Sequence, residues 1–315
     1  MAALATHALG RDHIELTRVG LGGVEIGPEQ GEPADVDRAV RVLAAAADAG
    51  INWIDTAEDY YETRNETLIG EALARCDASF HIATKVAPNR GNSGFRPEQV
   101  RAACHASLRR LRRDHVDLYF LHWPDDVVPL EETWGAMSEL VEEGLVRTIG
   151  LSNYDVADIE RCHAQRTVDL VQDGLSLVDH LDARERFSRC AELGVPVVVY
   201  EPLASGVLSG RTMEEVREIW KDWTEFGFYK RMLAPGRAER SEAVVDAMRP
   251  IARRHGISVA QLALAWVLHQ PGVAWALAGS RDGRHAHENA AAAAVDLRVS
   301  LDECEALIPL GPAFA

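Results

Sequence analysis

Eight short apolar segments rich in β-branched residues recur along this chain, with longer helical patterns between them. The helical patterns include residues 33–50, 96–111 and 130–144, with Asp35 near the start of the first, Gly50 at its end and Pro97 near the start of the second. Eight strands that alternate with helices over about 250 residues or more are typical of a (β/α)₈ barrel. A doubly wound sheet is the structural alternative. The eight segments span residues 19–23, 52–56, 80–86, 116–123, 147–153, 168–174, 195–203 and 273–280.

A short segment ahead of the first strand, ALGRDHIEL at residues 8–16, has the pattern of a β-hairpin. Its turn is expected at Gly10 to His13, and the hairpin would close the bottom of the barrel. No linker, low-complexity tract or break in composition divides the chain. We therefore expect one domain over residues 1–315.

The acidic composition narrows the classes of partner. Lysines and arginines number 33 against 49 acidic residues, a formal net charge of −16 that repels nucleic-acid phosphates and anionic lipid. Charged residues interrupt every apolar run before the roughly 20 residues of a membrane span, and no basic region followed by an apolar one suggests export. The five cysteines form no CxxC pair, which argues against a zinc ribbon or a disulfide framework. We expect a cytoplasmic protein with no nucleic-acid, membrane or protein partner and no metal.

Polar side chains occur at the ends of seven consecutive predicted strands. In a barrel the loops after the strands converge on one pocket, so these side chains are expected to lie together. Each alone has an ordinary structural explanation, such as a helix cap, a solvated lysine or a structural histidine. As a set they predict a functional site. They are Asp55, Lys85, His122, Ser152 with Asn153, Gln172, Tyr200, and Ser280 with Arg281.

Tyr60 and Tyr61 follow the second strand and add a phenol to this set. A phenol has an unperturbed pKa of about 10, and a neighbouring ammonium such as that of Lys85 is expected to lower it. Asp55 would keep that ammonium charged in a desolvated pocket, and His122 would hydrogen-bond a substrate oxygen. The combination predicts a proton donor for a carbonyl oxygen.

With these residues the chain resembles the aldo-keto reductases, nicotinamide-dependent oxidoreductases built on a (β/α)₈ barrel. The segments DTAEDYYETRNETLIGEAL, IATKV, LYFLHWPD and IGLSNY are similar to the family's motifs, and the similarity runs from RVGLGG to HENAAAA. The resemblance makes Tyr60, rather than Tyr61, the general acid. It completes a catalytic tetrad with Asp55, Lys85 and His122, acting on a small carbonyl or alcohol substrate.

The resemblance also implies the cofactor contacts. The nicotinamide carboxamide would be held by Ser152, Asn153 and Gln172, and the ring of Tyr200 would stack on the nicotinamide. Arg281 can bind a 2′-phosphate bidentately, which favours NADPH over NADH. The loop PLASGVLSG would cross the pyrophosphate, and AGSRDGRHAHENAA would hold the adenosine phosphate. The implied contacts in these two segments are Pro202, Leu203, Ser205, Gly206, Ser280, Arg281, Glu288 and Asn289.

Four positions depart from the family pattern. Tyr61 replaces a common glycine, so its ring is expected at the pocket mouth or the loop is forced outward. Glu201 replaces a common serine, and strand alternation from Tyr200 is expected to turn its carboxylate away from the cofactor. The tyrosine-asparagine pair that usually follows the glutamine is missing. Gly279 and His285 stand where lysine or arginine is frequent.

Two alternatives belong to other functional classes. The family includes channel-associated β subunits, so a non-catalytic nucleotide-binding regulatory subunit of the same fold is one alternative. The twelve histidines and the run HAHE at 285–288 raise the second, a metal-dependent barrel hydrolase. His285 and His287 point to different sides of a helix, however, and no His-x-His motif ends a strand. The complete tetrad favours catalysis.

The substrate is the least constrained part of the prediction. Trp123, beside His122, and Tyr61 are the candidate pocket residues. The aromatic segment 214–229 is either a lid over the pocket or a helix packed on the barrel. Sugars, aldehydes, ketones and steroids all remain open as substrates.

Overall fold

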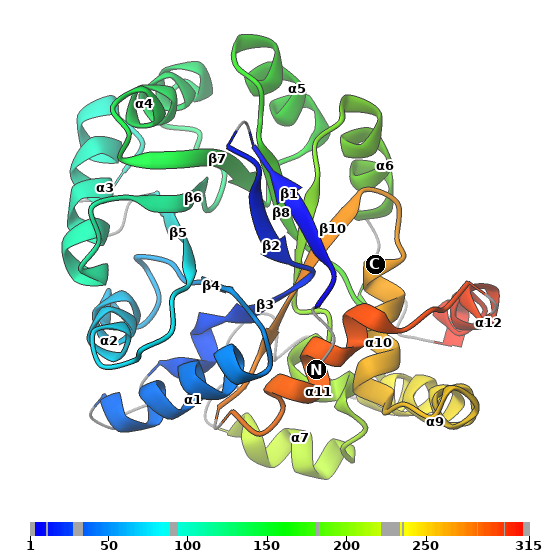
Figure 1. Ribbon diagram of the computed structural model, residues 1–315. Helices are drawn as coiled ribbons and strands as arrows, with labels where there is room; N and C mark the ends of the chain where they lie inside the picture. Colours follow the sequence, from blue (N-terminus) through cyan, green and yellow to red (C-terminus); the bar gives the residue numbers. More distant parts are fainter. Residues whose placement is uncertain are drawn as a thin grey trace.

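A closed barrel of eight parallel strands forms the centre of the computed structural model (Figure 1). The strands follow the chain around the barrel in the order β3 to β10, and β10 closes it by pairing with β3. This confirms the predicted (β/α)₈ barrel. The structure describes residues 4–10, 12–27, 34–88, 94–179, 183–221, 234, 236–281, 283–298 and 300–310.

The barrel strands coincide with the eight apolar segments. All but one of them carry buried side chains from end to end or nearly so, since helices cover the outside and side chains fill the inside. The exception is β7, which has one exposed residue, Arg147, near its start. The strands are β3 (Val19–Gly22), β4 (Trp53–Asp55), β5 (His81–Val86), β6 (Val116–Leu121), β7 (Val146–Ser152), β8 (Leu170–Gly174), β9 (Val197–Tyr200) and β10 (Val273–Gly279).

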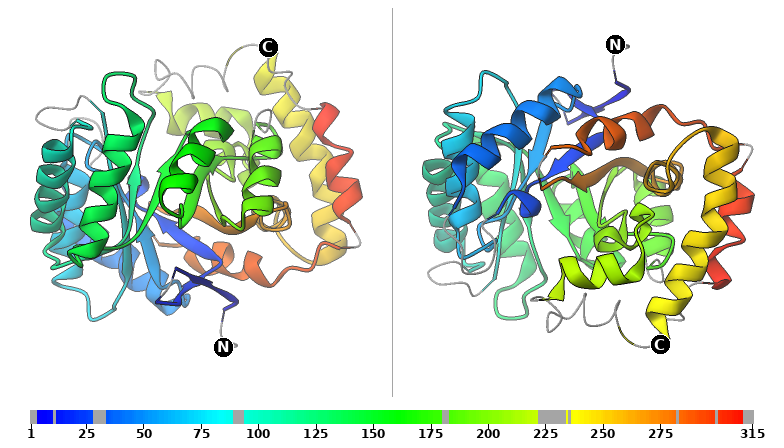
Figure 2. Two further views of the ribbon diagram at one scale, coloured as in Figure 1. Left: turned by 90° about the horizontal axis from the view of Figure 1, so that it is seen from above. Right: turned by 90° about the horizontal axis from the view of Figure 1, so that it is seen from below.

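Helices surround the barrel, as the two further views show (Figure 2). Asp35 caps α1 by accepting a hydrogen bond from the backbone N–H of Arg38 at 2.8 Å, and Pro97 is the first residue of α3, as the sequence predicts. The α-helices are α1 (Val36–Asp48), α2 (Arg64–Leu73), α3 (Pro97–Leu111), α4 (Leu130–Glu142), α5 (Val156–Gln165), α6 (Ala183–Leu193), α7 (Met213–Ile219), α9 (Arg237–His255), α10 (Val259–Leu268), α11 (Ala286–Ala291) and α12 (Leu301–Glu305). Short 3₁₀ helices are η1 (Gly23–Ile26), η2 (Ala204–Ser209), η4 (Ala292–Ala294) and η5 (Ile308–Leu310).

An antiparallel hairpin, β1 (Thr6–Leu9) and β2 (Ile14–Thr17), covers one end of the barrel. Its apolar side chains, including Leu9 and Leu16, are buried with those that fill the barrel interior. Two interior tryptophans donate ring N–H hydrogen bonds to the hairpin strand: Trp53 to the carbonyl of Thr17 at 2.8 Å and Trp275 to that of Leu16 at 3.3 Å. The hairpin therefore seals this end, as predicted, and leaves the opposite end for the loops that follow the strands.

Candidate active site

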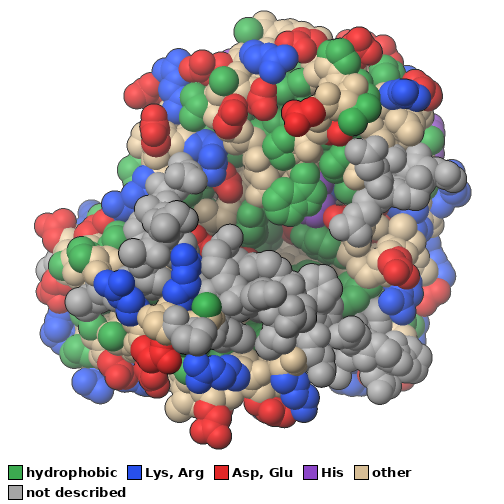
Figure 3. Space-filling model, turned by 180° about the vertical axis from the view of Figure 1, so that it is seen from behind, with side chains coloured by type: hydrophobic (Ala, Val, Ile, Leu, Met, Phe, Trp, Pro, Cys, Tyr) green, Lys and Arg blue, Asp and Glu red, His purple; other side chains and the backbone are tan. Residues whose placement is uncertain are grey.

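The predicted polar strand ends meet at the end of the barrel opposite the hairpin. Asp55 is the last residue of β4, Lys85 lies in β5 and His122 directly follows β6. Tyr60 lies in the loop between β4 and α2. Viewed from this side, the surface is hollowed, and hydrophobic side chains and a histidine line the hollow (Figure 3).

Lys85 connects these groups. Its ammonium is fully buried and donates hydrogen bonds to Asp55 Oδ1 at 2.5 Å and to the carbonyl of Thr56 at 2.8 Å. The same nitrogen lies 3.3 Å from the phenol oxygen of Tyr60. The other oxygen of Asp55 accepts a hydrogen bond from the Gln172 side chain at 2.9 Å. A continuous chain of polar contacts therefore runs from Gln172 through Asp55 and Lys85 to Tyr60.

The phenol of Tyr60 has a pKa well above its usual value. Burial is the largest cause, and the carboxylates of Asp55, Asp59 and Glu201 add to it. The prediction that the pKa of this phenol is lowered is therefore wrong for the net shift, although a neighbouring ammonium by itself favours the phenolate. Asp55 neutralises the ammonium at close contact, so the charges around the phenol are on balance negative. Tyr60 consequently stays protonated at neutral pH, the state that a proton donor requires.

His122 is held on several sides. Its ring stacks on that of Trp123, with centroids 5.2 Å apart and 25° between the planes, and meets the ring of Tyr60 edge-on at 5.6 Å. The backbone carbonyl of His122 accepts a hydrogen bond from the Asn153 side chain at 2.9 Å. Burial and the charge of Lys85 lower the pKa of His122, although Asp59 opposes them. The imidazole is therefore neutral at pH 7.

The loop that carries Tyr60 is anchored by buried residues of the motif at 55–73. Asn65 accepts a hydrogen bond from the Thr56 hydroxyl at 2.6 Å and donates one to the carbonyl of Gly23 at 3.0 Å. Glu66, fully buried, accepts hydrogen bonds from Thr84 and Arg110, each at 2.6 Å. A Cβ at Gly70 would come within 2.2 Å of the carbonyl oxygen of Arg110. These motif residues thus build the support for the site rather than the site itself.

Tyr61 lies in a run of three residues with a left-handed backbone conformation. Tyr61, Glu62 and Thr63 have φ values of 52°, 56° and 73°, a left-handed conformation that glycine adopts most easily. The Tyr61 hydroxyl donates to the carbonyl of Val24 at 3.1 Å, and its ring lies so close to Gly27 that a Cβ there would clash at 2.0 Å. Tyr61 therefore joins its loop to the loop after β3. Trp123, by contrast, is 45% exposed beside His122, as a pocket residue should be.

The residues expected to hold the nicotinamide are adjacent to this cluster. Ser152 and Gln172 are paired in neighbouring strands β7 and β8, and both are buried. The Tyr200 hydroxyl donates a hydrogen bond to Asn153 Oδ1 at 2.7 Å. Asn153 has a φ of 67°, which is unusual for a non-glycine residue and directs its side chain back towards His122. The structure thus brings all four residues to one side of the tetrad.

Glu201 lies directly after β9, where the strand alternation assumed from the sequence stops. Strand β9 ends at Tyr200, and Glu201 has a φ of 52°, so the alternation assumed from the sequence does not continue. Burial is the largest cause of the raised pKa of both Tyr60 and Tyr200, and the Glu201 carboxylate contributes at each. The Glu201 carboxylate therefore acts on both phenols, while its orientation towards the cofactor stays a prediction.

The loop after β9 contains the residues expected at the pyrophosphate. Pro202 and Leu203 lead into η2, where Ser205 and Gly206 have φ values of 53° and 92°. The carbonyl of Ser205 accepts a hydrogen bond from the Trp220 ring N–H at 2.7 Å. Trp220 directly follows α7 and is only 7% exposed, so its ring packs against the loop after β9. Residues 222–229 lie outside the described residues.

Arg281, the residue expected at the 2′-phosphate, is half-exposed at the end of β10. Its Nε lies 3.2 Å from Glu25 Oε2, and its guanidinium lies 5.2 Å from the Trp220 ring centroid. Burial raises the pKa of Glu25, while Arg281, Arg38 and Arg211 oppose that shift. Sequence reasoning missed Glu25, Arg38 and Arg211. They are separated in the sequence, and only the folded structure shows that their charges act on one another.

The other expected adenosine contacts lie close by. The Ser280 hydroxyl accepts a hydrogen bond from the backbone N–H of Gly283 at 3.0 Å. Glu288 lies 3.2 Å from His285, and Asn289 donates a long hydrogen bond of 3.4 Å to the carbonyl of Gly279. Glu288 and Asn289 both lie in α11, so β10 and this helix bring the predicted set together.

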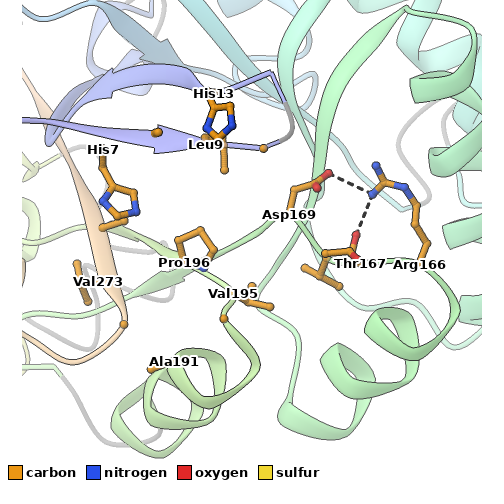
Figure 4. A pocket seen from close by; sticks show the side chains of 16 residues that line it. His7, Leu9, His13, Arg166, Thr167, Asp169, Ala191, Val195, Pro196 and Val273 are labelled. Carbon is orange, nitrogen blue, oxygen red and sulfur yellow. Dashed lines mark hydrogen bonds and ion pairs between the residues drawn. The ribbon is translucent and has the colours of Figure 1, made fainter.

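A second hollow, with a volume of about 680 Å³, lies at the hairpin end (Figure 4). His7 and His13 of the hairpin face Arg166 and Asp169 across it. Arg166 lies 3.1 Å from Asp169, which also accepts a hydrogen bond from the backbone N–H of Ile149 at 2.9 Å. The charged groups here are thus engaged with one another and with the backbone. In barrels of this type the chemistry lies at the other end.

In the described part of the chain, no helix is long and apolar enough to cross a membrane. No group of three or more histidine, cysteine or acidic side chains in it is arranged to hold a metal ion.

Comparison with known proteins places this geometry in one family. The sequence model of the aldo/keto reductase family matches residues 18–306. A soybean (Glycine max) protein, probable aldo-keto reductase 1, is 32% identical over 311 residues, which cover 96% of this chain and 88% of that protein.

Solved structures agree. A glycerol dehydrogenase from Gluconobacter oxydans has a TM-score of 0.82 at 27% identity and covers 100% of this chain and 98% of its own. An aldo/keto reductase from Klebsiella pneumoniae, solved with NADP and acetate, has a TM-score of 0.76 at 30% identity and covers 99% and 98%. With its barrel, its hairpin and this match over most of its length, the chain belongs to the aldo/keto reductase family and is an oxidoreductase.

Proposed function

We propose that residues 1–315 act as one domain, an NADPH-dependent reductase that interconverts small aldehydes or ketones and their alcohols, with Tyr60 as the general acid. The observation that carries the proposal is the buried chain of contacts from Asp55 through Lys85 to the Tyr60 phenol. Two relatives support it: one is named a glycerol dehydrogenase, and the Klebsiella enzyme was solved with NADP.

The residues present fit a phosphorylated dinucleotide. Three guanidinium groups, those of Arg281, Arg38 and Arg211, act on the buried carboxylate of Glu25. A 2′-phosphate carries the negative charge that such a cluster favours. The cluster would hold the adenosine phosphate, while Ser152, Asn153, Gln172 and Tyr200 would hold the nicotinamide. When bound, NADPH supplies the hydride.

The protein side chains supply the proton and its environment. Tyr60 is protonated at neutral pH and can donate to a carbonyl oxygen within hydrogen-bond reach. The Lys85 ammonium at 3.3 Å then stabilises the negative charge that forms on the phenol oxygen. Asp55, paired with both Lys85 and Gln172, keeps that ammonium charged and fixed in position. The exposed ring of Trp123 offers an apolar wall for the substrate.

The test removes the hydroxyl group of Tyr60. Tyr60→Phe removes the proton and keeps the ring, so NADPH binding should survive while turnover of carbonyl substrates falls by about two to four orders of magnitude. Stopped-flow absorbance of NADPH oxidation measures the turnover, and fluorescence titration measures the binding. Tyr61→Phe is the matched control, because it removes the hydroxyl of the neighbouring tyrosine, which donates a hydrogen bond to the carbonyl of Val24.

The results separate the alternatives. An active Tyr60→Phe enzyme with an inactive Tyr61→Phe enzyme would overturn the assignment of the acid. A wild-type protein that binds NADPH but reduces none of a broad set of aldehydes and ketones would support the non-catalytic regulatory subunit instead.

A further inference from the structure

Glu25 forms an ion pair with Arg281, the residue proposed to bind the 2′-phosphate. Glu25 Oε2 lies 3.2 Å from Arg281 Nε, and the two side chains are 22% and 40% exposed. Glu25 lies in η1, directly after β3, whereas Arg281 follows β10, 256 positions later in the sequence. The fold therefore places a carboxylate on the guanidinium group that a phosphorylated cofactor would need.

Arg38 fixes the backbone on both sides of this ion pair. Its Nη1 donates hydrogen bonds to the backbone carbonyl of Glu25 at 3.3 Å and to that of Arg281 at 3.2 Å. Its Nη2 donates to the carbonyls of Ile26 and Gly27 at 3.0 Å and 2.6 Å. The loop after β3 is thus tied to the loop after β10. The contact between Glu25 and Arg281 is therefore held by the fold and does not depend on two freely moving side chains.

The stem of the Glu25 side chain lies against Gly279, the last residue of β10. A Cβ at Gly279 would come within 2.3 Å of Glu25 Cγ, a distance at which one of the two would have to move. The glycine therefore gives Glu25 the room to reach Arg281. An acidic side chain occupies the space beside the strand end that leads to the proposed phosphate site.

The charge of the Glu25 carboxylate depends on its cationic neighbours. Burial raises the pKa of Glu25, and Arg281 is the strongest influence in the opposite direction, followed by Arg38 and Arg211. A phosphate group forms charge-assisted hydrogen bonds with a guanidinium group, so it competes with Glu25 for Arg281. It also brings a charge of the same sign close to Glu25, in surroundings that screen charges less than bulk water does. Both effects oppose the binding of a phosphorylated cofactor.

We propose that Glu25 is a specificity-determining residue that competes with the 2′-phosphate for Arg281 and so narrows the preference for NADPH over NADH. This deepens the proposed function and rests on it for the identity of the cofactor. NADH has no 2′-phosphate, so its affinity does not depend on the competition. The Trp220 ring, whose centroid lies 5.2 Å from the Arg281 guanidinium, gives that group a second contact that remains when the carboxylate is removed.

The first measurement is the affinity for each cofactor in the absence of substrate, by isothermal titration calorimetry. Glu25→Gln keeps the length of the side chain and removes its charge. NADPH should then bind roughly three- to thirtyfold more tightly, while the affinity for NADH should stay within about twofold. Glu214→Gln is the control, an equal loss of charge at an exposed position of α7, and should change neither affinity by more than about twofold.

Two results of this titration overturn the proposal. An unchanged or weaker affinity for NADPH in Glu25→Gln would mean that Glu25 is neutral towards the phosphate or orients Arg281 to bind it. Equal tightening of NADPH and NADH would mean that the carboxylate opposes the pyrophosphate, which both cofactors share.

The second measurement uses adenosine 2′,5′-bisphosphate and AMP, which differ in the 2′-phosphate and lack the nicotinamide. Glu25→Gln should tighten the bisphosphate by the same factor as NADPH and leave AMP within about twofold. An equal gain for AMP overturns the proposal. A wild-type protein that binds NADPH but reduces no carbonyl compound defeats the proposed function alone, because these affinities need no turnover. A protein that binds neither the cofactors nor the bisphosphate defeats both.

Discussion

Both ends of this barrel are hollowed and carry charged side chains, but they use those charges differently. At the hairpin end, Arg166 and Asp169 contact one another and nearby backbone groups at the protein surface. At the opposite end, Lys85 is fully buried and binds Asp55, with the Tyr60 phenol beside it. A buried charge is costly to place and must be paired. The comparison teaches that burial and coupling, more than a hollow with polar walls, distinguish the functional end.

The backbone makes the same distinction. Of the nine non-glycine residues with positive φ among those described, seven lie in the loops after β4, β7 and β9 at the site end. They include Asn153 and Glu201, which both act on the tetrad. Residues in this conformation cost about 1 to 3 kcal/mol each and persist where the surrounding structure requires them. The hairpin end has the other two, His13 in the hairpin turn and Arg112 at the end of α3, before β6.

The strongest test of this comparison is to remove one cation from each end of the barrel. Lys85→Met should reduce turnover by about two to four orders of magnitude, because charge that forms on the Tyr60 oxygen loses its ammonium neighbour. It should also lower the melting temperature, since Asp55 is left buried without its cation. Arg166→Met should keep turnover within about twofold, as expected for a surface pair. Steady-state kinetics and circular dichroism measure both. Equal losses of turnover would mean that the two ends are not distinct.

A smaller effect is expected at the adenosine phosphate. Arg281→Ala should weaken NADPH binding by roughly 10- to 150-fold, the range for a charge-assisted hydrogen bond of about 1.5 to 3 kcal/mol, and leave NADH binding almost unchanged. Fluorescence titration with the two cofactors supplies the internal control. If both affinities fell alike, the cluster around Glu25 would not be the phosphate site.

The smallest expected effect is a shift in pH dependence. Alcohol oxidation needs the Tyr60 phenolate, which forms only as the pH rises towards the raised pKa, while carbonyl reduction needs the phenol present below it. Glu201→Gln removes one of the charges that raise this pKa. The pH at which alcohol oxidation accelerates should therefore fall, by up to about one unit. Profiles of kcat/KM for a primary alcohol with NADP⁺ test this, with Glu62→Gln as the exposed control. A rise, or no change, would place Glu201 outside the field of Tyr60.

Some residues of the candidate site could be predicted from the sequence, and others could not. Asp55, Lys85 and His122 follow from the strand pattern, because the ends of parallel strands in a barrel must meet. Tyr60 required the family's motif in addition. The expectation for Glu201 rested on period-2 alternation, which holds only while the strand continues, and β9 ends one residue earlier.

The pKa of Tyr60 was misjudged for a related reason. The direction of the shift depends first on the loss of water around the phenol and then on several nearby carboxylates. The sequence gives the identity of these groups but neither their distances nor their burial. The contact between Asp59 and His122 was likewise invisible, since 63 positions separate the two residues.

The sequence by itself determined the alternation of strands and helices, the hairpin and the chemical types at the strand ends, because these depend on local periodicity and on the closure of one parallel barrel. Tertiary structure alone decided how the backbone turns at Glu201, which carboxylate approaches His122 and which cations surround Glu25. Those outcomes depend on loop conformations with left-handed residues and on electrostatic interactions that vary with distance and solvent exposure. No pattern along the chain encodes either quantity.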